Sequence, residues 1–185
     1  MAIETELKAP VLLIAVPQLA DPNFYRGVVL VIEHGEEGSM GLLINRPTDV
    51  ELGDFCNSQQ MEFKGNRSGL VYNGGPVQKD RAFILHASEH QGPETELIVE
   101  STRMSYSLES LRSLAEDPPN RLRIFLGYAG WGAEQLAQEV TSGAWLTAPA
   151  TEKLIFDIAF DQVWEAALRD LGIDPIQLMH SGAIH

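Results

Sequence analysis

The segment VVLVIEHGEEGSMGLLIN, residues 28–45, best indicates how this chain folds. Two apolar runs, 28–32 and 40–45, flank a polar stretch that contains Gly35 and Gly38. Apolar runs on either side of a short glycine-containing loop are typical of a β-hairpin. The segment therefore predicts two antiparallel strands.

Other segments resemble strands on both sides of this hairpin. The apolar run 11–16 reads as a buried strand that Pro17 ends. Further strands are expected at 69–72, 82–86, 97–100 and 122–126, and a short extended piece begins at 145. Because hairpins dominate this pattern, we expect largely antiparallel pairing.

Helical spacing of apolar residues predicts about four helices. They are expected at 49–60 with Asp49 as N-cap, at 107–115 with Ser107 as N-cap, at 133–140, and at 160–171 with Gly172 as C-cap. Strands interleaved with helices in this order indicate the α+β class. Length and the absence of a linker predict a single domain over residues 1–185.

The composition limits the classes of function. Thirteen lysines and arginines stand against 26 acidic residues, a formal net charge of -13, which argues against direct binding to nucleic acid. The single cysteine, Cys56, excludes an internal disulfide and fits a reducing compartment. The N-terminus is acidic where a signal peptide is basic, and no apolar run approaches a membrane span. We therefore expect a cytoplasmic protein without a membrane segment.

Two motifs have both a functional and a structural interpretation. The segment GYAGWG, residues 127–132, is expected to open the helix at 133–140, where free N–H groups could hold an anion. A plain strand-to-helix turn is the alternative. Arg46 could bind a carboxylate or phosphate, or pair with an acid of this chain. Tyr128 and Trp131 could stack on a ligand or pack in the core.

No catalytic or metal constellation is predicted. Residues 86–90 match H-x-x-E-H, but that motif binds zinc only on a helix, and here it follows a strand. Ser39 lacks the flanking glycine of a nucleophile elbow, and Cys56 is expected to be buried and inert. Glu139 is expected to be solvent-exposed. The sequence therefore implies no cofactor and no metal.

The motifs together resemble a known family. They are LIA-x-P at 13–17, DP-x-F at 21–24, GLLINRP at 41–47, GGPV at 74–77, LH at 85–86, GYAGW at 127–131, QL-x-x-E at 135–139 and G-x-W at 143–145. In order and spacing they are similar to the YqgE/AlgH family, from about residue 10 to residue 175. The resemblance implies a bacterial protein whose mixed, bent sheet forms a pseudo-barrel with flanking helices. One branch carries the label of a transcriptional regulator of exopolysaccharide genes, given on genetic grounds, and the family brings no established enzymatic activity.

The resemblance also suggests where a site could lie. Its signatures include the NRP and glycine segments, which favour a candidate ligand site of Asn45, Arg46, Gly74, Gly75, Tyr128, Gly130 and Trp131. Three functions follow as hypotheses. The first is a non-catalytic regulatory or adaptor protein that binds a protein partner or a small anionic ligand. The second is an enzyme acting on a phosphorylated or carboxylated metabolite, with His86 or Glu139 moving a proton. The third is a DNA-binding regulator, which the charge disfavours.

Overall fold

A computed structural model describes residues 6–181 of the chain. Its strands are β1 (Val11–Ala15), β2 (Val28–Gly35), β3 (Gly38–Leu43), β4 (Pro47–Glu51), β5 (Leu70–Asn73), β6 (Val77–Ala87), β7 (Thr95–Val99), β8 (Thr102–Ser105), β9 (Leu122–Gly132) and β10 (Trp145–Ala148). Its α-helices are α1 (Leu52–Ser58), α2 (Leu108–Glu116), α3 (Gln135–Thr141), α4 (Val163–Asp170) and α5 (Pro175–Ser181). A π-helical turn at Lys153–Asp157 and a 3-10 turn at Phe160–Gln162 precede α4.

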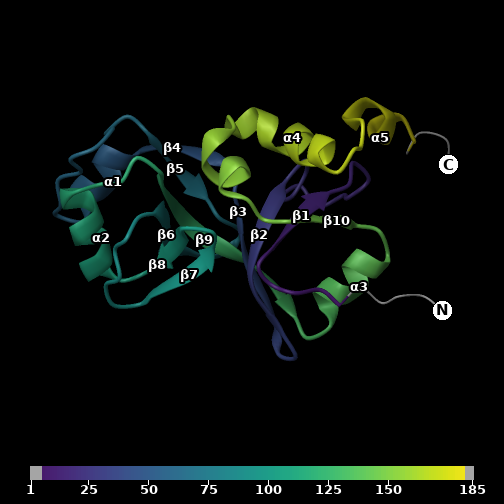
Figure 1. Cartoon of the computed structure of the whole chain (residues 1–185), viewed down its shortest axis with the longest axis horizontal. Coiled ribbons are helices and arrows are strands. Elements are labelled where there is room, and N and C mark those ends of the chain that lie inside the picture. The colour runs from purple at the N-terminus through teal and green to yellow at the C-terminus, as the bar shows by residue number, and fades with distance from the viewer. Residues whose placement is uncertain (1–5, 182–185) are drawn as a thin grey trace.

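The strands form one curled, largely antiparallel sheet, which confirms the predicted fold class. The main path runs β10-β1-β2-β3-β9-β6-β8-β7, and β4 and β5 lie off it. Only β5 with β9 pairs in parallel among the described strands. Figure 1 shows α1 and α2 beside the β4–β8 end, α3 beside the β1–β3 end, and α4 and α5 along one side.

Strand β1 and the first five residues of β2 are apolar at every position, because the sheet is covered on both faces there. Successive side chains of a strand point to opposite faces. Leu12 and Ile14 thus pack in the cluster with Trp164 and Leu168 of α4. The intervening Leu13, with Ala15, Val29 and Val31, packs with Leu136 and two tryptophans on the other face. A third cluster lies under α1 and α2.

The glycine segment 127–132 is part of a strand, so the prediction of a turn there was wrong, whereas the helix predicted at 133–140 is present as α3, which begins at Gln135. Residues 122–132 form one long strand, β9, because its second half finds backbone partners in β3, from Ala129 with Gly41 to Gly132 with Gly38. Its first half pairs with β6 and β5. Strand β9 therefore joins the two ends of the sheet, and it bends at Gly127, whose φ is 77°.

The helix expected at 49–60 is shorter than predicted. Asp49 is not an N-cap but an exposed residue of β4, because residues 47–51 pair with β5 before the chain turns into α1. Cys56 is buried as expected. The cap at Ser107 is confirmed, since its side chain accepts a hydrogen bond from the N–H of Ser110 at 3.1 Å. Strand β8 and helix α5 were not predicted.

Candidate functional site

A hollow of about 570 Å³ opens where β9 bends between the two ends of the sheet. We call it the acidic pocket. Its walls come from β2, β3, β6, β7, β8 and β9, and it is lined by Glu33, Glu37, Gly38, Ser39, Met40, Val77, Arg81, Phe83, Glu96, Met104, Tyr106, Tyr128, Gly130 and Trp131. Its volume is in the range of pockets that hold small ligands or the side chains of a partner.

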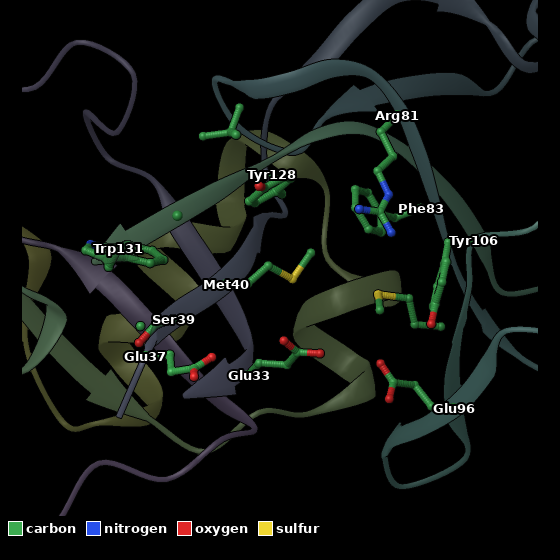
Figure 2. A pocket seen from close by; sticks show the side chains of 14 residues that line it. Glu33, Glu37, Ser39, Met40, Arg81, Phe83, Glu96, Tyr106, Tyr128 and Trp131 are labelled. Carbon is green, nitrogen blue, oxygen red and sulfur yellow. The ribbon is translucent and has the colours of Figure 1, made fainter. Parts of the chain in front are cut away.

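The base of the acidic pocket is aromatic and sulfur-rich. The Phe83 ring meets the Tyr128 ring edge to face, with centroids 6.0 Å apart, and lies 6.5 Å from the Tyr106 ring. Met40 points into the centre of the hollow (Figure 2). Opposite Met40 in the β3–β9 ladder stands Gly130, so no side chain fills the space above it. The lack of a side chain at Gly130 thus helps to keep the pocket open.

The rim of the acidic pocket carries three exposed glutamates. Glu33, Glu37 and Glu96 form no ion pair with any residue that the structure describes. A bulge in β2 between Val31 and Glu33 shifts the register by one residue, so that Glu33 stands opposite Met40 and shares its face. The rim therefore has an excess of unmatched negative charge.

One cation faces these glutamates from the other side of the hollow. The guanidinium of Arg81 lies over Phe83, 5.0 Å from the ring centroid, and 5.5 Å from that of Tyr106 (Figure 2). Both distances are within the range of a cation–π contact. Arg81 thus shows that the aromatic wall accepts a cation.

A serine and a histidine meet at the pocket's edge. Ser39 Oγ lies 2.6 Å from Nδ1 of His34, its cross-strand neighbour in the β2–β3 hairpin. No described carboxylate is hydrogen-bonded to the other ring nitrogen of His34. The pair has the contact distance of a nucleophile and a base but lacks the third member that orients such a base.

The structure brings three of the predicted site residues to this pocket, namely Tyr128, Gly130 and Trp131. Trp131 is only 7% exposed, and its ring packs against Phe24 and Trp145 on the far face of the sheet. Core packing therefore accounts for most of the Trp131 contacts. Tyr128 and Gly130 are the two that face the hollow.

Gly74 and Gly75 lie where the chain crosses the bend of β9. A Cβ on Gly74 would stand 2.3 Å from the carbonyl oxygen of Gly127, and a Cβ on Gly75 would stand 2.2 Å from the carbonyl carbon of Tyr128. The two backbones can approach this closely only without side chains. The glycines thus shape the bend and do not line the acidic pocket.

Asn45 and Arg46 lie apart from the acidic pocket, in a second recess of about 570 Å³. We call it the arginine recess. It is bounded by the loop before β2, the start of β4 and the start of α4, and Arg26, Arg46 and Trp164 are among its lining residues. Asn45 is 4% exposed and uses its amide internally, accepting from the N–H of Val28 and donating to the carbonyl of Arg26. Asn45 is therefore a support of the recess.

The residues named for proton transfer, His86 and Glu139, lie in neither recess. His86 is fully buried, with its ring nitrogens 2.6 Å and 2.8 Å from the hydroxyls of Ser88 and Ser105. Burial, with the neighbouring charges of His90 and Arg103, lowers the pKa of His86 to about 4. Glu139 is half-buried rather than exposed, and burial raises the pKa of its carboxyl.

Metal binding has no support among residues 6–181, where no group of three or more potential ligands gathers. His86 lies near the end of β6 and His90 lies in the following loop, so the H-x-x-E-H segment is not helical. Within the same residues, no helix has the length and apolar character needed to cross a membrane.

Sequence reasoning missed most of the acidic pocket. Glu33, Met40, Arg81 and Glu96 come from four different strands, Tyr106 follows a fifth, and no local motif links them. One signal was available in β9. In the sequence, Ala129 and Trp131 alternate with Gly130 and Gly132, which is the period of a strand.

Fold and pocket together define a protein with a curled α+β sheet and an open, charged hollow at its bend. The chain belongs to the AlgH-like family, whose model matches residues 12–176. This establishes the predicted family. The relatives described next are bacterial proteins.

Relatives and solved structures agree over nearly the whole chain. A UPF0301 protein of Myxococcus xanthus is 43% identical over 172 residues, which cover 92% of this chain and 94% of that protein. A UPF0301 protein of Stutzerimonas stutzeri is 42% identical over 166 residues, or 88% of this chain and 87% of that one. The solution structure of AlgH from Pseudomonas aeruginosa is 38% identical, with a TM-score of 0.75, and covers 94% of this chain and 96% of its own.

Proposed function

We propose that this is a non-catalytic, cytoplasmic adaptor or regulatory protein whose acidic pocket binds a basic, partly apolar segment of a protein partner. The observation that carries the proposal is the set of three unmatched glutamates above an aromatic base. This charge favours a cationic segment over the anionic ligand that the sequence also allowed. A lysine or arginine side chain suits the pocket, because the carboxylates attract its charge and the Tyr128 ring, which Arg81 does not cover, can accept it by cation–π contact.

The flexible side chains in the pocket fit a protein segment as occupant. Met40 and Met104 line it together with Tyr106 and Tyr128. Methionine adapts its shape to irregular partners, and tyrosine supplies contact area at low entropic cost. The pocket can therefore accept an apolar side chain next to a basic one. Direct DNA binding fits least, because phosphates would meet the same glutamates.

The test uses a short labelled peptide of alternating lysine and leucine, with a glutamate-for-lysine version as its counterpart. We expect the basic peptide to bind and the acidic peptide not to bind. Replacing Glu33, Glu37 and Glu96 together by Gln should weaken binding about tenfold at low salt, at roughly 0.5 kcal/mol per rim charge. Glu89→Gln is the matched control, since Glu89 is exposed and lies outside the pocket.

A steric variant tests the location independently of charge. Gly130→Leu should close the pocket and abolish binding, because Gly130 faces Met40 across the ladder. The nearest atom to a Cβ there is 3.4 Å away on the Tyr128 ring, so the strand itself tolerates a side chain. Equal binding by wild type, the triple Gln variant and Gly130→Leu would rule out the proposal.

An acyl-transfer enzyme is the second candidate, and the 2.6 Å contact between Ser39 and His34 favours it. In such a reaction Ser39 Oγ would attack an ester carbonyl while its proton passes to His34, and the departing alkoxide would take that proton. Water would then release the acid from the acyl-serine. A fluorogenic ester and the Ser39→Ala variant test this candidate. Hydrolysis that is absent, or that persists in Ser39→Ala, would exclude it.

A further inference from the structure

We propose that the arginine recess is a second site, and that it binds an organic anion that carries a flat ring. It lies between the loop before β2 and helix α4, and none of its lining residues belongs to the acidic pocket. The proposal is independent of the function proposed above. It places the predicted residue Arg46, with Asn45 as a support, in a site for an anion, whereas the acidic pocket is proposed to bind a cationic segment.

The recess holds two arginines that have no acidic partner. Neither Arg26 nor Arg46 forms an ion pair with a residue in the described range 6–181. Of the two carboxylates that line the recess, Glu165 is already paired with Arg169 at 3.3 Å, which leaves Asp161. Two arginines without an acidic partner in one recess are unusual in a chain with twice as many acids as bases.

The fold holds both guanidiniums in place. Arg46 donates from its side chain to the carbonyl oxygen of Tyr25, and its burial lowers the pKa of its guanidinium. A half-buried cation without a counter-ion loses hydration that a bound anion would replace. Arg26 has a positive φ of 52°, and the Asn45 side chain fixes its carbonyl group at 2.9 Å. Positive φ outside glycine is uncommon and tends to occur at functional positions.

Aromatic side chains next to the guanidiniums provide the contact for a ring. Tyr25 and Phe160 line the recess and are 53% and 45% exposed. The guanidinium of Arg26 lies 5.2 Å from the Trp164 ring centroid and 5.5 Å from that of Tyr25. A planar ligand can stack on exposed rings and on a guanidinium plane, while its anionic head pairs with the arginines. The volume of about 570 Å³ suits a ligand of that size.

The test is calorimetric titration of the full chain with adenosine 5′-monophosphate and with indole-3-acetate. They pair a ring with a phosphate and with a carboxylate, so the two titrations show whether the recess accepts either anionic head group. Adenosine and inorganic phosphate, each with half of the required chemistry, should bind at least tenfold more weakly than the nucleotide. Saturable binding of either ring-bearing anion that depends on the arginines supports the proposal. The absence of such binding at millimolar concentration overturns it.

Two variants locate the binding. Arg26→Gln and Arg46→Gln should each weaken it at least tenfold, whereas Arg112→Gln, at an exposed position of α2 outside the recess, should leave it unchanged. Arg46 also supports the loop through Tyr25, so its variant is first checked by circular dichroism. Arg26→Gln is the decisive variant, because its guanidinium donates only to the sulfur of Met179 among the described residues. Undiminished binding by Arg26→Gln would overturn the proposal.

Discussion

Acid should destabilise this protein through His86. The fully buried ring has a pKa of about 4 in the folded chain, against 6.5 for the ordinary side chain. Between these values the unfolded chain binds one more proton than the folded chain, so stability falls as the pH falls. Integrating the difference gives a loss of about 2 kcal/mol between pH 7 and pH 5, and about 3 kcal/mol in total by pH 4.

Urea unfolding of wild type and His86→Gln at pH 7, 6 and 5 measures this effect. Loss of the ring contacts with the hydroxyls of Ser88 and Ser105 should lower the variant's free energy of unfolding by about 1–3 kcal/mol at pH 7. From pH 7 to pH 5, however, the variant should lose about 2 kcal/mol less than wild type, since carboxylate effects are common to both. The exposed His180→Gln on α5 is the control and should follow wild type. Parallel profiles for wild type and His86→Gln would refute the reasoning.

Three further changes test the packing. Glu152→Gln should lower the free energy of unfolding, measured with urea, by roughly 1–3 kcal/mol. The nearly buried carboxylate accepts three hydrogen bonds from residues 101–102 and pairs with Arg121 at 2.9 Å. An unchanged free energy of unfolding would contradict this. Gly75→Ala should lower the melting temperature sharply or prevent folding, since its Cβ would overlap the backbone of β9, whereas Gly35→Ala meets no atom within 4 Å and should be mild. Trp164→Phe should lower the free energy of unfolding by about 1–3 kcal/mol, because it removes the 2.8 Å hydrogen bond to the buried carbonyl of Ala15. A free energy of unfolding equal to that of wild type would argue against that bond.

The sequence was sufficient for features with a local physical cause. Residues 28–45 indicated their hairpin because two apolar runs flank a glycine-containing loop. The cap at Ser107 was predictable because it depends on a residue type and a spacing of three. The α+β class followed from the order of such elements. These features depend on residues that are close together in the chain, so the spacing of residue types in the sequence reveals them.

What escaped prediction depends on partners distant in the chain. The glycine segment 127–132 has the composition of a turn, and it becomes a strand because β3 pairs with it. Likewise Glu33 and Glu96 become neighbours of one pocket only when β2 and β7 are placed around β9. Arg46 was named from the sequence as a candidate anion ligand, but its separation from Tyr128 and Trp131 required the structure.

The sharing of β9 between the two ends of the sheet has a consequence for how the protein is made. Strand β9 begins at residue 122. During synthesis, strands β1–β8 therefore leave the ribosome before β3 and β6 can pair with β9. Strand β1 pairs with β10, which is synthesised later than β9. Pairings between such distant segments are slow to form, and unpaired edges invite association with other chains. Nascent chains should therefore depend on chaperones until about residue 150 leaves the ribosome, and a break between α2 and β9 should yield two fragments that are soluble only together.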